Sequence, residues 1–219
     1  MRPIARVIPL VVLVTCMVLF AVRGLRLPAV TPPCRWTSAP VLCAEMPLDG
    51  RWFDAVLHAK ENAPDDWAWS TWVDMPFLFA YGALLAGAAL ARKKHRRLAL
   101  ATAVMLAFAS ACDLGENVGI LRALAGEPTD ALAQWTRTCA VAKFSLAALG
   151  CALTCVLRAS EAGRRGRVAW SLVAAVFAVG GFAFATPALV MPSFAVIVAS
   201  CVIAGVETLR RRASTSIVR

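Results

Sequence analysis

The amino-acid sequence predicts an all-α integral membrane protein, a six-transmembrane helix bundle with both termini in the cytoplasm. Two observations lead to this class. The chain has 219 residues and is 60% hydrophobic, whereas soluble domains are nearer half. The excess lies in long runs that are poor in charge and are separated by short basic clusters, as in multi-pass membrane proteins. We therefore expect a single membrane domain over residues 1–219, located in the cell membrane.

Six apolar runs are the candidate spans, because about 20 apolar residues cross a hydrocarbon core of about 30 Å. They cover residues 7–22, 73–91, 98–120, 133–157, 168–186 and 188–206. We expect a tight hairpin at Thr186 and Pro187, because one helix over both final runs would be twice as long as a bilayer requires. The first run also suits a signal peptide, but no clean small-x-small cleavage site follows it. We expect an uncleaved anchor; five spans, or four after a signal peptide, are the alternatives.

The distribution of charge sets the expected orientation. The formal net charge is +10, and basic residues cluster in segments 91–97, 158–167 and 209–214, each beside a candidate span. An excess of Lys and Arg marks cytoplasmic loops. The long loop 23–72, the short loop 121–132 and the turn at 186–187 then face outward. Basic clusters beside spans favour contact with membrane lipid and argue against a nucleic-acid partner.

The long outer loop 23–72 is rich in tryptophan. Trp favours the headgroup level of a membrane, so we expect Trp69 and Trp72 to belong to an aromatic belt. Apolar residues at positions 52, 53, 56 and 57 recur at about helical spacing and predict a short amphipathic helix within residues 51–63. We expect this helix on the outer membrane surface, with a lid over an intramembrane site as the alternative.

Cysteine usage fits the predicted topology. The chain has eight cysteines, of which Cys34 and Cys43 fall in the outer loop and the others in spans. Because extracytoplasmic compartments are oxidising, we predict a disulfide between Cys34 and Cys43. Cys151 and Cys155 share one helix face but lack a charged activator nearby in sequence, which disfavours thiol redox chemistry.

The most informative stretch is CDLGENVGILRAL, residues 112–124, at the end of the third span. On a helix Asp113, Glu116 and Asn117 are i, i+3 and i+4, so they share one face. Asp113 lies ~22 Å along the helix from Leu98, in the outer part of the hydrocarbon. Charged groups at this depth are costly and usually face the bundle interior, where they pair. We therefore expect this face to turn inward.

The fourth span supplies the expected partners. Lys143 lies in an otherwise apolar run and can remain charged if it faces Asp113. Arg137 lies nearly two turns above Lys143, and we expect it to pair with Glu116, because the two spans run antiparallel. We expect Arg122 to extend to the outer headgroups.

The second span adds Asp74 and Tyr81, which are seven residues apart and so share one helix face. Asp74 precedes Pro76 by two residues at the expected helix start, which is a typical N-cap position. We favour capping for Asp74, with a role in the site as the alternative.

Together these residues predict an outward-facing polar pocket within the membrane. We assign Asp113, Glu116 and Lys143 to acid–base catalysis, and substrate binding to a second set: Asn117, Arg137, Asp74 and Tyr81. The pocket would bind or process a lipid-soluble small molecule.

Three alternatives remain for this polar face. One is a proton- or ion-coupled transporter, which the absence of an internal repeat disfavours. Another is an accessory protein whose charges hold a membrane-protein partner. The third is a salt-bridge network that only fixes helix packing, although buried ion pairs stabilise poorly compared with apolar packing.

Metal and cofactor chemistry is poorly supported by the sequence. The only histidines are His58 and His95, which we place on opposite sides of the membrane. This placement excludes a bis-His haem, and no zinc-ligand spacing is present. The sequence also lacks a glycine-rich phosphate loop and a nucleophile elbow. We therefore expect no metal and no cofactor.

Overall fold

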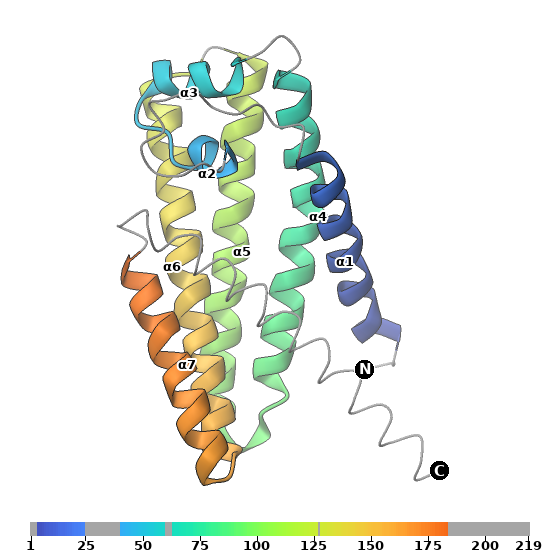
Figure 1. Cartoon of the computed structure of the whole chain (residues 1–219), viewed down its shortest axis with the longest axis vertical. Coiled ribbons are helices and arrows are strands. Elements are labelled where there is room, and N and C mark those ends of the chain that lie inside the picture. The colour runs from blue at the N-terminus through green and yellow to red at the C-terminus, as the bar shows by residue number, and fades with distance from the viewer. Residues whose placement is uncertain (1–3, 25–39, 60–62, 127, 184–219) are drawn as a thin grey trace. The chain divides into compact units, whose positions relative to one another are not determined.

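A computed structural model describes residues 4–24, 40–59, 63–126 and 128–183 (Figure 1). These residues form helices joined by short connections, and the described part contains no strand. The all-α class is therefore confirmed for this part of the chain. The sixth predicted span, residues 188–206, lies outside the described residues, as do Thr186 and Pro187.

Three helices are long and apolar enough to cross a membrane: α4 (Ala63–Leu90), α5 (Arg96–Ala125) and α6 (Asp130–Glu161). They contain the second, third and fourth predicted spans, which supports a membrane protein. Helix α1 (Ile4–Gly24) has a shorter apolar stretch over Ile8–Leu19, and α7 (Arg164–Ala183) covers most of the fifth predicted span. A short 3-10 helix, η1 (Lys93–His95), connects α4 to α5.

The predicted outer loop 23–72 is partly helical. It contains α2 (Pro40–Glu45) and α3 (Gly50–Leu57), and α4 begins ten residues before the predicted span. An apolar run marks only the part of a helix that suits lipid, and α4 continues through a more polar first turn. Asp65 and Asp66 lie in that turn, where acidic side chains complement the helix dipole.

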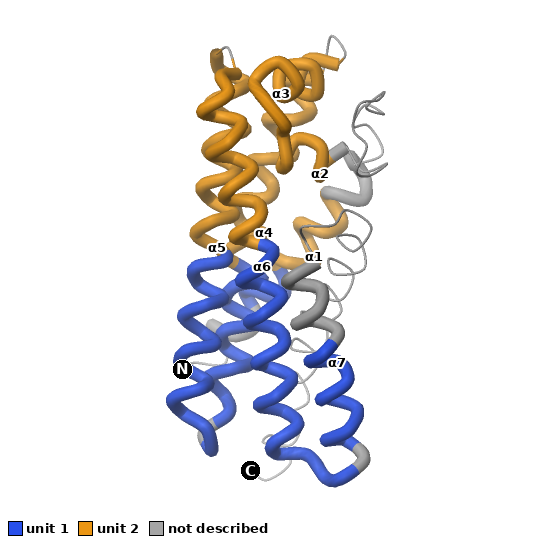
Figure 2. Tube along the Cα trace, turned by 90° about the vertical axis from the view of Figure 1, so that its left-hand side faces the viewer, with its two compact units in different colours: residues 1–11, 80–109, 144–219 blue, residues 12–79, 110–143 orange. Residues whose placement is uncertain are grey.

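The described helices belong to two compact units (Figure 2). Unit 1 comprises residues 1–11, 80–109 and 144–219, and unit 2 comprises residues 12–79 and 110–143. Helices α4, α5 and α6 each contribute one segment to both units. The functional residues predicted from the sequence lie in unit 2, with the exception of Tyr81, which is buried in unit 1.

The core of unit 1 is built from small residues at close helix contacts. A Cβ added to Gly150 of α6 would lie 2.5 Å from a methyl carbon of Leu106 of α5, so the Leu106 side chain would have to shift. Ala89, Ala99 and Leu157 form a second buried cluster. Small residues let membrane helices approach closely, which is the main source of their attraction in lipid.

The core of unit 2 contains the apolar face of α3. Trp52, Phe53, Val56 and Leu57 are buried in one cluster with α2 and residues of α4, α5 and α6. The helix expected within residues 51–63 therefore exists, but its apolar face packs on protein and not on the membrane surface. Protein contacts replace the expected lipid contacts because buried apolar residues of α4, α5 and α6 pack against this face of α3.

Hydrogen bonds cap the N-terminus of α3 and also attach this helix to α6. Asp49 caps the helix by accepting from the backbone N–H of Trp52 at 2.7 Å. The N–H of Gly50 donates to Asp130 of α6 at 2.8 Å, and a Cβ at Gly50 would lie 2.5 Å from the carbonyl oxygen of Pro128. Close backbone approach at Gly50 thus seats α3 on the start of α6.

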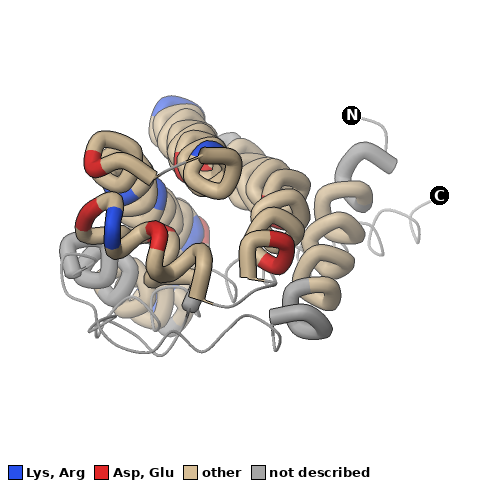
Figure 3. The backbone as a smooth tube through the Cα atoms, turned by 90° about the horizontal axis from the view of Figure 1, so that it is seen from above, with Lys and Arg blue, Asp and Glu red and all other residues tan. Residues whose placement is uncertain are grey.

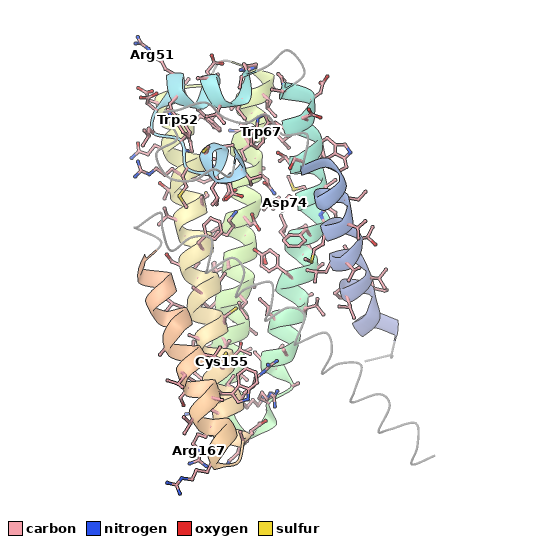
Figure 4. The ribbon with its side chains drawn as sticks, viewed as in Figure 1. Arg51, Trp52, Trp67, Asp74, Cys155 and Arg167 are labelled. Atoms are coloured by element: carbon pink, nitrogen blue, oxygen red, sulfur yellow. The ribbon has the colours of Figure 1, made fainter. Side chains whose placement is uncertain are left out.

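The outer-loop tryptophans occupy different environments. Trp67 is buried in α4, and its indole N–H donates to the carbonyl of Val56 in α3 at 3.3 Å (Figure 4). Trp72 is 63% exposed, whereas Trp69 is half-buried. The aromatic belt stays a prediction, and Trp36 lies outside the described residues.

Candidate functional site

Lys143 of α6 lies among three carboxyl groups in the interior of unit 2. Its Nζ is 2.8 Å from Glu116 Oε2, 3.1 Å from Asp113 Oδ1 and 3.3 Å from Glu45 Oε1. It also donates a hydrogen bond to Glu116 Oε1 at 3.0 Å. We refer to Lys143, Glu45, Asp113 and Glu116 as the Lys143 cluster.

The cluster is almost fully shielded from solvent. The side chains of Lys143, Asp113 and Glu116 are 8%, 4% and 1% exposed, and that of Glu45 is 13% exposed. Asp113 and Glu116 are one helical turn apart on α5, so one face of the helix presents both to Lys143. The sequence-based expectation that Lys143 faces Asp113 agrees with this geometry, although Lys143 pairs with Glu116 as well.

Two glycines let α5 and α6 approach closely near the cluster. A Cβ at Gly115 would lie 3.0 Å from the sulfur of Cys139, and a Cβ at Gly119 would collide with the hydroxyl of Thr136. The G-x-x-x-G spacing of Gly115 and Gly119 places both on one face of α5. The close approach of the two helices brings Lys143 within reach of the acids.

Glu45 was not among the residues selected from the sequence. It is the last residue of α2, and the preceding residues Cys43 and Ala44 are buried in the core cluster around α3. This packing directs Glu45 to Lys143. No periodic signal marks a six-residue helix, so Glu45 appeared in the sequence only as one acidic residue of the outer loop.

The acids of the cluster outnumber its cation. Glu45 Oε2 is buried and accepts no hydrogen bond from any described residue. Burial raises the pKa of the Glu45 carboxyl; the charge of Lys143 opposes this rise and that of Asp113 adds to it. Buried carboxylates require a partner or a proton, because removing the ionised form from water is costly.

A second polar contact joins α5 to α4. The Asn117 amide donates to Asp74 Oδ2 at 2.8 Å. The favoured N-cap role of Asp74 is wrong, because α4 begins at Ala63 and Asp74 lies well inside it (Figure 4). Its partner is a side chain of α5 and not the first turn of its own helix. Pro76, which suggested a helix start, lies inside α4 as well.

Another predicted site residue, Arg137, lies outside the cluster. Arg137 is exposed and forms no ion pair among the described residues, and Glu116 pairs with Lys143 in its place. Arg137 and Lys143 are six residues apart on α6, about 240° around the helix, so they cannot share a face. Tyr81 belongs to unit 1 and is buried there.

The predicted disulfide lies partly outside the described residues. Cys43 is buried in α2, whereas Cys34 falls in the segment 25–39 that is not described. The pairing of Cys34 with Cys43 therefore stays a prediction. In the described residues, no group of three His, Cys, Asp or Glu side chains has a geometry that could hold a metal ion.

No protein-family model matches this chain, and neither a curated protein nor a solved structure is significantly similar to it. The Lys143 cluster is therefore interpreted from its own geometry and chemistry.

Proposed function

We propose that this chain is a multi-pass membrane protein whose Lys143 cluster binds a lipid-soluble small molecule and exchanges protons with it. The observation that carries the proposal is the convergence of three carboxyl groups on one buried ammonium group. One ammonium neutralises one carboxylate. The cluster therefore carries more carboxyl groups than its ammonium group can neutralise, and we propose that the surplus is held in protonated form, because burying an ionised group costs several kcal/mol.

A cluster of this kind suits acid–base chemistry. A carboxyl group that keeps its proton near neutral pH can act as a general acid, and an ionised neighbour can accept a proton. Asp113 and Glu116 are the groups to which we assign these roles, with Lys143 fixing both. Glu45 adds a third acid, with one buried oxygen that accepts no hydrogen bond from a described residue.

The location of the cluster favours a lipid-soluble ligand. Asp113, Glu116 and Lys143 lie on helices that are long and apolar enough to cross a membrane. Ionisable residues in such helices usually mark a substrate or ion pathway. Glu45 comes from α2, which is not a spanning helix.

Proton-coupled transport is the second candidate. The Asn117–Asp74 contact favours it, since it extends the polar groups from α5 to α4 and provides a further carboxyl beyond the cluster. Chains of intramembrane carboxyls are typical of proton relays. The two candidates share the Lys143 cluster and differ in whether the bound molecule is chemically changed.

We further propose the six-span topology with both termini in the cytoplasm of a cell-membrane protein. The basic residues of segments 91–97 and 158–167 belong to unit 1, whereas acidic residues of α3 and of the first turns of α4 and α6 belong to unit 2. Figure 3 marks the described Lys and Arg residues in blue and the Asp and Glu residues in red. The positive-inside rule then assigns α2 and α3 to the outer side. A Cys34–Cys43 disulfide on that side would tether α2 and hence Glu45.

Thiol counting tests the disulfide. Membranes are solubilised in SDS and labelled with a maleimide-polyethylene glycol before and after reduction. Of the eight cysteines, we expect six to react without reductant and all eight after it. Cys34→Ser should release one further thiol. Eight reactive cysteines before reduction would contradict the disulfide.

The test of the proposed function compares small molecules retained by purified protein. Wild type, Glu116→Gln and Arg137→Gln are purified in mild detergent, and their organic extracts are compared by mass spectrometry. Arg137→Gln is the matched control, because Arg137 is exposed and outside the cluster. We expect the extracts of wild type and Arg137→Gln to contain one species that is missing from the extract of Glu116→Gln. A density map of the wild-type protein should show this molecule beside Asp113. Identical extracts from three equally folded proteins would favour a structural network.

A further inference from the structure

A second feature of unit 2 lies outside the Lys143 cluster. An open hollow of about 590 Å³ lies between the end of α5 and the start of α6. Its lining includes Val118 and Arg122 of α5, Leu132 and Trp135 of α6, and Thr129 between the two helices. None of these residues belongs to the Lys143 cluster, and the proposed function leaves them without a role.

One wall of the hollow is apolar and fixed in place. Trp135 is 55% exposed, yet its indole N–H donates to the carbonyl of Gly115 at 3.0 Å, which holds the ring against α5. Val118 is 38% exposed, and Leu132 is half-buried beside it. Gly119 also lines the hollow, and a Cβ at this position would collide with the Thr136 hydroxyl. The hollow therefore exists without any rearrangement of α5 or α6.

The rim of the hollow carries hydrogen-bond donors and a positive charge. Among the described residues of the lining, Arg122 alone is charged; its side chain is exposed and makes no hydrogen bond or ion pair with any described residue. The Thr129 hydroxyl oxygen accepts from the N–H of Leu132 at 3.2 Å, which leaves its proton available to a ligand. A guanidinium group and a hydroxyl beside an apolar wall suit a phosphate that is attached to a hydrocarbon chain.

The position of the hollow along the helices matches a lipid headgroup. Arg122 lies in the last turn of α5, and Trp135 lies in the second turn of α6. Arg and Trp near the ends of spanning helices are typical of the membrane interface. The match between the hollow and a headgroup requires that α5 and α6 cross the membrane, and it is independent of the acid–base role of the Lys143 cluster.

We propose that this hollow binds an anionic phospholipid. Arg122 and the Thr129 hydroxyl bind the phosphate, and one acyl chain lies along Val118, Leu132 and Trp135. The preference for an anionic lipid follows from the positive charge of Arg122, because none of the described residues of the lining is acidic.

The test uses the full chain purified in mild detergent and titrated with brominated phosphatidylglycerol or brominated phosphatidylcholine. Quenching of Trp fluorescence reports binding, and Trp135→Phe identifies the quenched ring. We expect Arg122→Gln to weaken phosphatidylglycerol binding about tenfold and to remove the preference over phosphatidylcholine. Arg137→Gln, which changes an exposed arginine of α6 outside the hollow, should bind like wild type.

Two further measurements distinguish a phospholipid from other occupants of the hollow. Val118→Phe fills the hollow from an exposed position and should abolish quenching of Trp135 with little effect on folding. Inorganic phosphate should not displace the lipid, because the acyl chain supplies part of the affinity. Equal lipid binding by wild type, Arg122→Gln and Val118→Phe would overturn the proposal. Displacement by inorganic phosphate, or a lipid-free dimer that Val118→Phe dissociates, would overturn it as well.

Discussion

The two units are built largely from segments of the same three helices, yet their interiors differ in kind. In unit 1, α4, α5 and α6 pack through small and aliphatic residues such as Gly150 and Leu106. In unit 2, the same helices enclose Lys143, Asp113 and Glu116. Charge in unit 1 occurs at helix ends, where Arg92 donates to Glu161 at 2.7 Å and Arg158 lies 4.7 Å above the ring of Trp170.

The difference between the two interiors distinguishes residues that helix packing requires from residues that it does not require. In unit 1 the contact of α5 with α6 at Leu106 and Gly150 is close and apolar, and the ion pair of Arg92 with Glu161 lies at the helix ends. The charges of unit 2 are therefore not needed to bring α5 and α6 together, since Gly115 and Gly119 already allow that approach. A surplus of acid that packing does not require is evidence for chemistry, because buried charges are costly to retain.

The largest expected effect in unit 2 follows from removing its cation. Lys143→Met leaves three buried acids without a counter-charge and should lower the free energy of unfolding by about 3–5 kcal/mol. Glu116→Gln should cost less than about 1 kcal/mol, because Asp113 and Glu45 still neutralise Lys143 and one surplus acid disappears. Unfolding in mixed detergent–SDS micelles measures both values. Equal losses for the two variants would indicate a simple one-to-one ion pair.

The matching perturbation of unit 1 is steric. Gly150→Ala forces a methyl group against Leu106 and should cost about 1–3 kcal/mol by overpacking. Gly87→Ala of α4 is the control, because a Cβ there meets nothing within 4 Å. It should stabilise the helix by about 0.5–1 kcal/mol. The same unfolding assay applies, and a neutral Gly150→Ala would show that the contact with Leu106 is loose.

The smallest expected effect is the dependence of unit 2 on pH. Burial raises the pKa of Glu45 above its ordinary value of 4.5, so folding favours its protonated form. That contribution is complete below pH 4.5 and is lost as the pH rises through the raised value. Lys143, Asp113 and Glu116 are the charged groups that face the same carboxyl.

Glu45→Gln isolates this contribution, because glutamine cannot lose a proton. The melting temperatures of wild type and variant should be similar at low pH. As the pH rises, the wild type should fall relative to the variant. A difference that instead grew toward acid would show that Glu45 is stabilised in its ionised form.

Helix periodicity in the sequence predicts a large part of this site. Asp113 and Glu116 were predicted on one inward face, and Lys143 opposite Asp113, because the spacing of charges within an apolar run fixes both. The pairing of Arg137 with Glu116 was wrong because depth alone was matched and the angle around α6 was not. The capping role of Asp74 was wrong because α4 extends beyond its apolar run.

Tertiary contacts account for what the sequence could not supply. Glu45 reaches Lys143 only because α2 packs beside α3, and neither short helix leaves a periodic signal that specifies its docking. The amphipathic pattern of α3 identified its apolar face but not whether lipid or protein covers it. The membrane character of α4, α5 and α6 is supported, and the six-span count stays a prediction.

Infrared spectroscopy of the purified protein at neutral pH tests the central claim most directly. Three acids around one lysine should leave at least one protonated carboxyl group, visible as a carbonyl stretch that shifts in D₂O. We expect this band to weaken in Glu45→Gln and in Glu116→Gln, and to remain in Asp65→Asn, which changes an exposed acid of α4. A wild-type spectrum with every carboxyl group ionised would contradict the account, because the cluster would then hold no proton to exchange.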